Sequence, residues 1–433
     1  MSMIVKNNIE ALRVVNLLDQ NSNMMQKNLT KVATGMKINS AQDDSAPWSI
    51  SERMRMRIRA LEQDNQNVQN DAALMKTAEG AVSNTIEVLK TLKERAINSA
   101  NDSNTDEDRA TIQKEVNQFI DQIDDNALVQ FNGKYLIDGT KNNVVSASAT
   151  ILLNQSLDTG TAASDALTAL KNRAGDSLGI QATDYYTVSW VKNGKTETTS
   201  GSVGSTALSA LAVTAVGGTI QNYAANTAIG TDKFGLDAYT PDKTEGVVLA
   251  ANSAGVPDQI SGFTISITDG QGNIKKAANA ALDAFKLYQR AENKTGDKSL
   301  TFHTGAEANV AIKVGMGDMR ATALGLKEGN DKLSVTTKEN ANAAINVIDN
   351  ALTMALNQQV DIGSVLSRLD YTQSNIITMR DNDQESESVI RDADMAKAMT
   401  DYTKSNVLLQ TAQAMLAQAN QNPSAVLSLL QNQ

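Results

Sequence analysis

Few side chains in this sequence are of the types that carry out chemistry. The sole histidine, His303, lies in "TFHTG", where we expect a strand or a turn. Cysteine is absent, and one histidine cannot complete an H-E-x-x-H zinc motif. We therefore interpret His303 as a structural residue, and we expect no catalytic residues, no metal ligands and no cofactor.

Two other motifs have spacings that binding or catalysis sometimes uses. The glycines of "VGMGDM" (314–319) are close together, as in a phosphate-binding loop, but no G-x-G-x-x-G follows a strand and opens a helix. We expect a turn there. Asp43 and Asp44 are adjacent before a predicted helix, and we interpret them as caps that the helix dipole favours rather than as a catalytic pair.

Basic side chains alternate with other residues in "RMRMRIRAL" (53–61). On a helix, alternate positions spread around the surface instead of forming one patch. We therefore favour a solvated or intersubunit face over an anion-binding site. In a stacked polymer these arginines would meet acidic residues of a neighbouring copy, for which Asp121, Asp124 and Asp125 are candidates.

The overall composition excludes several classes of partner. The chain has 39 Lys and Arg against 49 Asp and Glu, a formal charge of −10 and a pI near 4.9. We expect no nucleic-acid partner, because nucleic-acid binding relies on basic surfaces. No run of about 18 apolar residues could span a bilayer, and the N-terminus lacks the apolar core of a secretory signal. We expect no membrane contact and, on export, no cleaved signal peptide.

The elements around these residues are mainly long helices. Two series of apolar residues repeat at intervals of seven, each over about four heptads. The coiled-coil core that they predict consists of Leu61, Val68, Met75, Val82 and Leu89 in the first series and Ile348, Ile362, Leu369 and Ile376 in the second. Because an isolated amphipathic helix is marginal in water, we expect the two helices to pack on each other.

Shorter elements lie between these helices. Thr105 and Asp108 have the spacing of a capping box before a third helix, and Asn132-Gly133 is typical of a hairpin turn. From 141 to 298 the composition shifts to Ser, Thr, Ala, Gly and Val, which indicates a β-containing insertion that folds independently. We expect one amphipathic helix at 278–291 and the aromatic anchors Tyr185, Tyr186, Trp190 and Phe263.

Both ends of the sequence carry apolar residues on several helical faces. We expect these residues to serve subunit packing and polymerisation, because one antiparallel partner would leave apolar surface exposed. They are Ile4, Ile9, Leu12, Val15 and Leu18 near the N-terminus, and Leu409, Leu416, Val426, Leu427, Leu429 and Leu430 near the C-terminus.

Several stretches, in order, resemble bacterial flagellins. They include "LTKVATGMKINSAQDDSAPWSISERMRMRIRAL", "TAEGAVSNTIEVLKTLKERAINSAN", "FNGKYLIDG" and "LAQANQNPSAVLSLL". The resemblance covers roughly 1–140 and 299–433 and implies a mainly α fold. Its parts would be an inner helical polymerisation domain (1–42 plus 391–433), an outer helical coiled-coil domain with short β-hairpins (43–140 plus 299–390) and a variable, surface-exposed β-containing insertion (141–298).

The resemblance also implies a function, a location and partners. The protein would be a structural, non-enzymatic subunit that self-assembles into the helical bacterial flagellar filament for swimming, outside the cell. Its partners would be other copies of itself, a flagellar export chaperone, the filament cap and the hook-filament junction proteins. Two alternatives stay open, namely that the chain is itself a hook-filament junction protein, or that it is a flagellin scaffold displaying an adhesive insert.

A final expectation concerns the vertebrate innate receptor for flagellin. By resemblance, the residues facing that receptor are Leu89, Thr91, Arg95 and Glu115. In "LKTLKERAIN" the chain has Thr91 where the family has an Arg, and Arg95 where it has a Leu. A lost bidentate donor and a cation in place of an apolar contact each weaken a complementary site, so we expect weak receptor activation.

Overall fold

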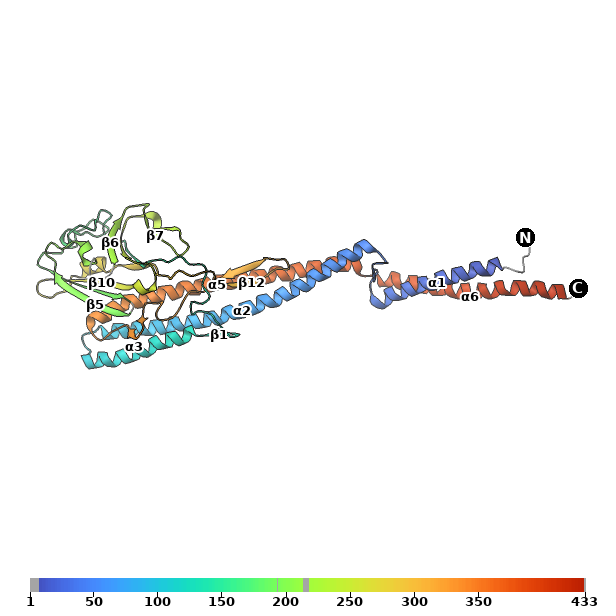
Figure 1. Cartoon of the computed structure of the whole chain (residues 1–433), viewed down its shortest axis with the longest axis horizontal. Coiled ribbons are helices and arrows are strands. Elements are labelled where there is room, and N and C mark those ends of the chain that lie inside the picture. Colours follow the sequence, from blue (N-terminus) through green and yellow to red (C-terminus); the bar gives the residue numbers. More distant parts are fainter. Residues whose placement is uncertain (1–7, 193, 213–217, 432–433) are drawn as a thin grey trace. The chain divides into compact units, whose positions relative to one another are not determined.

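The structure, a computed structural model, describes residues 8–192, 194–212 and 218–431; of residues 242 and 422–431 it describes the backbone only. The helices are α1 (Ile9–Thr34), α2 (Ser45–Ser99), α3 (Asp106–Ala127), α4 (Lys276–Leu282), α5 (Lys338–Arg391) and α6 (Met395–Gln431), shown in Figure 1. The strands are β1 (Gln130–Phe131), β2 (Lys134–Tyr135), β3 (Ile151–Asn154), β4 (Tyr185–Lys192), β5 (Lys195–Ser202), β6 (Gly218–Tyr223), β7 (Ala228–Thr231), β8 (Asp237–Tyr239), β9 (Gly246–Ala251), β10 (Ile260–Thr268), β11 (Lys286–Gln289), β12 (Leu300–His303), β13 (Ala311–Val314), β14 (Lys327–Glu328) and β15 (Asp331–Lys332).

The chain divides into two compact units. The terminal unit comprises Met1–Asn67, Thr304–Val310 and Thr372–Gln433, and the insertion-bearing unit comprises Val68–His303 and Ala311–Tyr371. Helices α2 and α5 contribute residues to both units. The insertion at 141–298 shares its unit with the helices on which it lies.

In the terminal unit, α1 and α6 pack antiparallel along their length (Figure 1). The buried residues of α6 up to residue 421 are small and lie seven apart, at Ala398, Ser405, Ala412 and Ala419. Small side chains let two helices approach closely. Two asparagines, Asn28 of α1 and its N-cap Asn8, bond across the contact: Asn28 Nδ2 donates to Ser405 Oγ at 2.9 Å, and Asn8 Nδ2 donates to the Ala419 carbonyl at 3.0 Å. The contact therefore combines close helix approach with polar fixation of register.

The segment after α1 and the segment between α5 and α6 are bonded to each other. Gly35 ends α1 in the left-handed conformation, at φ 71°, which glycine adopts without steric cost. An antiparallel bridge then pairs Met36 with Asp392. Two backbone hydrogen bonds, Lys37 N to Arg391 O and Ala393 N to Gly35 O, both 2.8 Å long, fix the junction.

The helical part of the insertion-bearing unit buries apolar residues at heptad spacing. In α2 these are Val68, Met75, Val82 and Leu89, and in α5 they are Ile348, Ala355, Ile362 and Leu369. The predicted capping box at Thr105 and Asp108 is confirmed at the start of α3. The predicted hairpin is confirmed as β1–β2, whose turn residues Asn132 and Gly133 both have positive φ.

The insertion contains two larger antiparallel sheets, with strand orders β10-β4-β5 and β11-β3-β9-β6. Their core includes Trp190, and Phe263 meets Phe285 edge to face with ring centroids 5.2 Å apart. Tyr185 was predicted as a core anchor but is exposed, because it alternates with Tyr186 along β4. The predicted helix at 278–291 is confirmed only at its start: α4 ends at Leu282, and the later part of the predicted segment forms β11, which pairs with β3.

The insertion is attached to α5 by side-chain and backbone contacts. Asn350 Nδ2 donates to the Ser261 carbonyl at 2.8 Å, and Leu287 N donates to Asn350 Oδ1 at 3.3 Å. Gly262 lies so close to α5 that a Cβ there would come within 2.6 Å of Val347 Cγ2. These contacts place β10 and β11 directly against α5.

Candidate assembly surface

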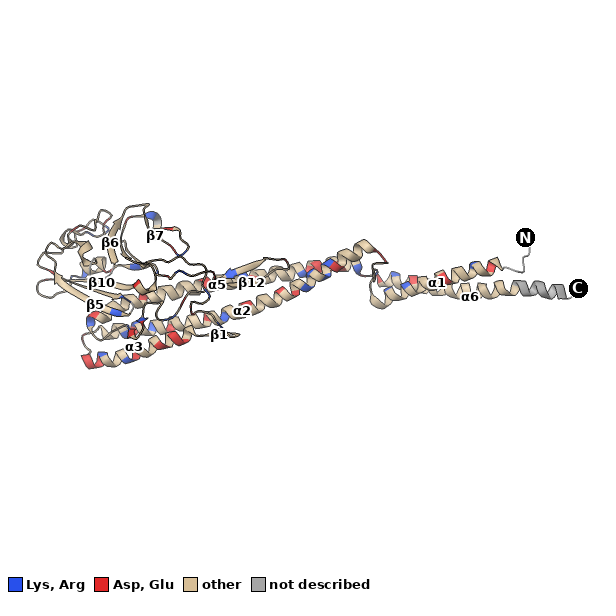
Figure 2. Cartoon of the chain, in the orientation of Figure 1, with Lys and Arg blue, Asp and Glu red and all other residues tan. Residues whose placement is uncertain are grey.

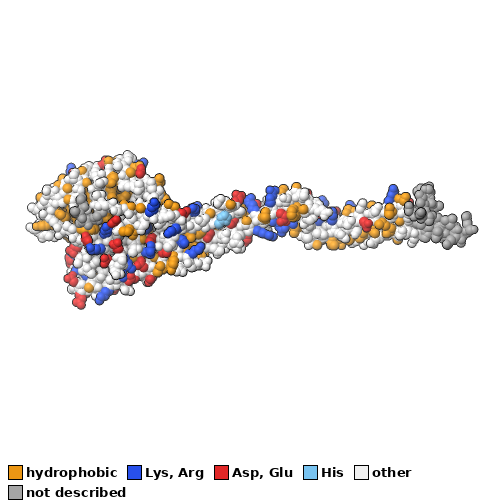
Figure 3. Space-filling model, viewed as in Figure 1, with side chains coloured by type: hydrophobic (Ala, Val, Ile, Leu, Met, Phe, Trp, Pro, Cys, Tyr) orange, Lys and Arg blue, Asp and Glu red, His pale blue; other side chains and the backbone are white. Residues whose placement is uncertain are grey.

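The terminal helices expose a large amount of apolar surface. Among the 26 residues of α1, all of them described, none is buried. The terminal apolar surface consists of the exposed residues Ile9, Leu12, Val15, Leu17, Met24 and Leu29 of α1 and Met395, Met399, Val407, Leu408 and Met415 of α6. Figure 3 shows apolar side chains at the surface of these helices. Contiguous exposed apolar surface usually marks an interaction site.

The residues predicted for subunit packing fall into three groups. Ile9, Leu12 and Val15 are exposed, and Leu12 has 63% of its surface accessible. Leu18, Leu409 and Leu416 are half-buried, at positions in heptad register with the α1–α6 contact. Ile4 and the side chains of Val426, Leu427, Leu429 and Leu430 lie outside the described residues. Sequence periodicity could not separate the first two groups, because apolar residues occur on more than one face.

Charged residues near the start of α2 are matched by acidic residues of α5. Arg57 Nε lies 3.0 Å from Asp383 Oδ2, and Arg55 Nε lies 3.7 Å from Glu387 Oε1. Figure 2 shows basic and acidic residues interspersed along these helices. Such partly exposed pairs add modest stability and orient the helices.

The acidic partners predicted for these arginines are already engaged within the chain. Lys332 Nζ lies 2.6 Å from Asp121 Oδ2, and Lys327 Nζ lies 3.1 Å from Asp124 Oδ2. Within one chain these two carboxylates are thus paired with lysines, and their pairing with arginines of a neighbouring copy stays a prediction. Sequence reasoning missed these lysines because they lie on the β14–β15 hairpin, far from α3 in sequence.

A nearly buried arginine anchors the end of α5. The Arg391 side chain is 8% exposed, and its Nη1 donates to Glu52 Oε1 at 2.6 Å. This hydrogen bond holds the pKa of the Glu52 carboxyl below its ordinary value.

The predicted role of Asp43 as a cap of α2 is wrong, because Asp43 Oδ2 accepts from the Asn39 and Ser40 amides of the preceding loop. The Asn39 amide is the main cause of the lowered pKa of Asp43.

The residues predicted to face the innate receptor do not form one open surface. Leu89 is fully buried in the heptad series of α2, so the prediction that it faces outward is wrong in this structure. Thr91 is half-buried and its hydroxyl donates to the Glu87 carbonyl. Arg95 Nε lies 3.0 Å from Glu115 Oε2, so the two charged residues engage each other.

His303 is the remaining residue that the sequence singled out for its chemistry. It is exposed at the end of β12, so the strand is the one observed of the two predicted alternatives, a strand or a turn. In the described part of the chain, no three His, Asp or Glu side chains gather closely enough to hold a metal ion. Within those same ranges, no helix combines the length and apolarity needed to cross a bilayer.

These features define a mainly helical structural protein that exposes apolar faces at its terminal helices. The bacterial flagellin N-terminal helical region matches residues 5–142, and the bacterial flagellin C-terminal helical region matches 345–430. A flagellin of Clostridium tyrobutyricum is 33% identical, with 97% of this chain and 99% of that protein covered. A flagellin of Bacillus subtilis is 27% identical, with 99% of this chain and 100% of that protein covered. The chain therefore belongs to the bacterial flagellin family.

Membership of this family confirms the predicted fold class and function. The chain is a structural subunit of the flagellar filament, and proteins of this family assemble with copies of themselves. Among solved structures, the flagellar junction protein FlgL of Legionella pneumophila is 14% identical, with 79% of this chain and 99% of that chain covered, at a TM-score of 0.33. FliC of Burkholderia pseudomallei is 18% identical, with 69% of this chain and 99% of that chain covered, at a TM-score of 0.26.

Proposed function

We propose that the terminal apolar surface forms the contacts through which copies of this chain assemble into the filament. The observation that carries the proposal is α1, a helix that packs on α6 and yet buries none of its residues. A helix of this kind gains most of its stability from tertiary packing. Neighbouring copies would supply the missing packing, and repeated heterologous contacts would generate an open helical polymer.

Seeded filament growth tests this proposal. Purified full-length protein is incubated with short filament seeds and imaged by electron microscopy, where long regular tubes are expected for the wild type. Val407→Glu and Met415→Glu each place a charge on the terminal apolar surface, and we expect both to stop elongation. Ile274→Glu adds the same charge at an exposed apolar position of the insertion and serves as the control.

The alternatives give different results in the same experiment. Persistent monomers or short capped stubs of wild-type protein would favour the hook-filament junction interpretation. Normal elongation of both Glu variants would remove the terminal apolar surface from the assembly contacts. Loss of elongation in Ile274→Glu alone would move the assembly contact to the insertion.

The same proposal assigns roles to the three sequence regions. Residues 1–42 and 391–433 would form the inner polymerisation domain, 43–140 and 299–390 the outer coiled-coil domain, and 141–298 the displayed insertion. Before assembly, the exposed terminal helices would be covered by an export chaperone, and at the filament ends by the cap and the junction proteins. Export would occur without a cleaved signal peptide, which intact-mass measurement of filament subunits checks directly.

We also infer that the chain activates the innate receptor weakly and catalyses no reaction. The engaged Arg95–Glu115 pair and the buried Leu89 support weak recognition. A receptor reporter-cell assay compares the wild type with an enteric flagellin and with the double variant Thr91→Arg, Arg95→Leu. We expect the double variant to give a stronger receptor response than the wild type of this chain. A wild-type response equal to that of the enteric protein would contradict the inference.

A further inference from the structure

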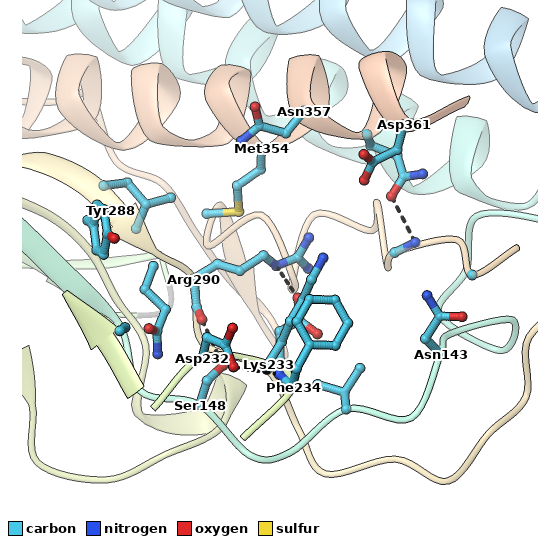
Figure 4. A pocket seen from close by; sticks show the side chains of 18 of the residues that line it. Asn143, Ser148, Asp232, Lys233, Phe234, Tyr288, Arg290, Met354, Asn357 and Asp361 are labelled. Atoms are coloured by element: carbon cyan, nitrogen blue, oxygen red, sulfur yellow. Dashed lines mark hydrogen bonds and ion pairs between the residues drawn. The ribbon is translucent and has the colours of Figure 1, made fainter. Parts of the chain in front are cut away.

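A cavity of about 700 Å³ lies between α5 and the insertion, within the insertion-bearing unit. Figure 4 shows Met354, Asn357 and Asp361 projecting from α5 toward it, with Tyr288 at one side and the Asp232–Phe234 loop facing them. The volume is within the range of small-ligand sites, about 300–1,000 Å³. The assembly contacts proposed above lie on the terminal helices and do not involve this cavity.

Aromatic rings stand exposed at the cavity. Phe234 has 61% of its surface accessible, and Tyr288 is also exposed. The backbone of the loop that carries Phe234 is held by Asp232, whose Oδ1 accepts hydrogen bonds from the amides of Phe234 at 2.9 Å and Leu236 at 2.8 Å. Tyr288 is fixed by a hydrogen bond from its hydroxyl to the Tyr239 carbonyl. Rigid rings offer flat apolar faces at low entropic cost.

Three cations line the cavity, and each lies near another group of the chain. Lys233 Nζ lies 5.2 Å from the centroid of the Phe234 ring, and Lys243 Nζ lies 5.2 Å from that of Tyr239. Arg290 Nη2 donates to the Asp318 carbonyl at 3.3 Å, and its Nε lies 3.5 Å from Glu292 Oε1. The lining carries four carboxylates against these three cations, so its net charge is negative and disfavours an anionic ligand.

Neutral and acceptor groups remain free to bind. The side chains of Asn357 and Asp361 have no hydrogen-bond or ion-pair partner among the described residues, and the buried Oε1 of Gln289 lacks a hydrogen bond. The "VGMGDM" glycines help to shape the wall. A Cβ at Gly315 would come within 2.3 Å of the Asn143 amide carbon, and one at Gly317 within 2.9 Å of Gln358 Oε1.

We propose that this cavity binds a neutral oligosaccharide. Sugars present hydroxyl groups that both donate and accept hydrogen bonds, which matches the amide and carboxylate groups of Asn357 and Asp361. Their C–H faces match the exposed rings of Phe234 and Tyr288. A short, uncharged saccharide is the ligand class that uses both features and needs no free cation.

A glycan array with full-length monomer tests the proposal. The array carries neutral hexose and N-acetylhexosamine oligosaccharides beside sialylated and sulfated ones, and we expect binding to neutral members. Surface plasmon resonance then measures the affinity for the best neutral trisaccharide on the array. Phe234→Ala should weaken it about tenfold through loss of the ring face, and Asp361→Ala should weaken it severalfold.

Leu236→Ala is the matched control, because Leu236 lies in the same loop and is 66% exposed but does not line the cavity. Its affinity should stay within about twofold of the wild type. The proposal is overturned if no glycan binds, if only sialylated or sulfated glycans bind, or if Phe234→Ala binds the neutral trisaccharide as tightly as the wild type does.

Discussion

The helices of the two units carry similar apolar patterns but satisfy them differently. In the insertion-bearing unit, the heptad residues of α2 are fully buried within the chain. In the terminal unit, α1 has apolar residues on several faces and buries none of them. A heptad pattern thus predicts that a helix has a partner, but it does not say whether that partner is in the same chain.

Side-chain size at the contact explains much of this difference. The buried heptad series of α2 in the insertion-bearing unit, at Val68, Met75, Val82 and Leu89, holds Val, Met and Leu, whereas the described buried series of α6 holds Ala and Ser. Burial stabilises in proportion to the apolar area removed from water, so the α1–α6 contact gains less per residue. If the proposed assembly holds, the terminal helices depend correspondingly more on contacts outside their own chain.

The largest expected effect on monomer stability comes from the buried series of α2. Leu89→Ala should lower the free energy of unfolding by about 2–5 kcal/mol, because it removes a fully buried side chain and leaves a cavity. Urea unfolding of the monomer measures the change. Ile97→Ala, at an exposed position of the same helix, should change it by less than about 0.5 kcal/mol. Equal effects of the two variants would contradict the comparison.

A pH-dependent prediction concerns Asp71, a partly buried carboxyl of α2. Burial raises its pKa to about 6, from 3.8. The folded state therefore binds this proton more tightly than the unfolded state, so the stabilisation is complete below about pH 4 and is lost as pH rises through 6. A two-unit shift corresponds to about 3 kcal/mol, which solvent screening at this site reduces to about 1 kcal/mol.

Asp71→Asn keeps the shape of the neutral carboxyl and removes its titration. We expect the variant to be about 1 kcal/mol more stable than the wild type at pH 7 and no more stable at about pH 4. Thermal unfolding across this range measures the difference. Glu94→Gln, at an exposed position of α2, should show no such pH-dependent gain. A constant difference between Asp71→Asn and wild type at all pH values would rule out the raised pKa.

Much of the helical fold could be predicted from the sequence, because its signals are local and repetitive. The heptad series, the Thr105–Asp108 cap and the Asn132-Gly133 turn each depend on residues close together in the chain. The 278–291 segment shows where this reasoning fails. Its apolar spacing suits a helix, but pairing with the distant strand β3 converts the second half into β11. Tertiary context overrides propensity at such positions.

The candidate sites divide in the same way. Exposed apolar residues at the terminal helices could be predicted, because both faces of each helix are visible in the sequence. The partners of Asp121 and Asp124 could not be, because Lys332 and Lys327 follow them by about 200 residues. The cavity beside α5 was equally hidden, since its lining is gathered from five separate stretches of chain.

A smaller effect is expected from an ion pair that joins α2 to α5. Lys93 Nζ lies 2.6 Å from Asp349 Oδ1, with both side chains substantially exposed. Lys93→Met should lower the free energy of unfolding by less than about 1 kcal/mol, and about 1 M salt should abolish the difference. Lys90→Met breaks a pair within α2, with Glu87, and should cost still less. A larger loss for Lys90→Met would place the stabilisation inside the helix.

The smallest effect on the monomer should come from the terminal apolar surface. Leu12→Ala removes an exposed side chain of α1, so the monomer's free energy of unfolding should change by less than about 0.5 kcal/mol. In the filament, where a neighbouring copy would bury this leucine, the substitution would remove about 1.5–3 kcal/mol of burial free energy. The critical concentration for seeded growth would then rise by about tenfold or more. Ile274→Ala should change neither quantity. If Leu12→Ala destabilised the monomer as much as Leu89→Ala does, α1 would be closed within its own chain and the contrast between the two units would disappear.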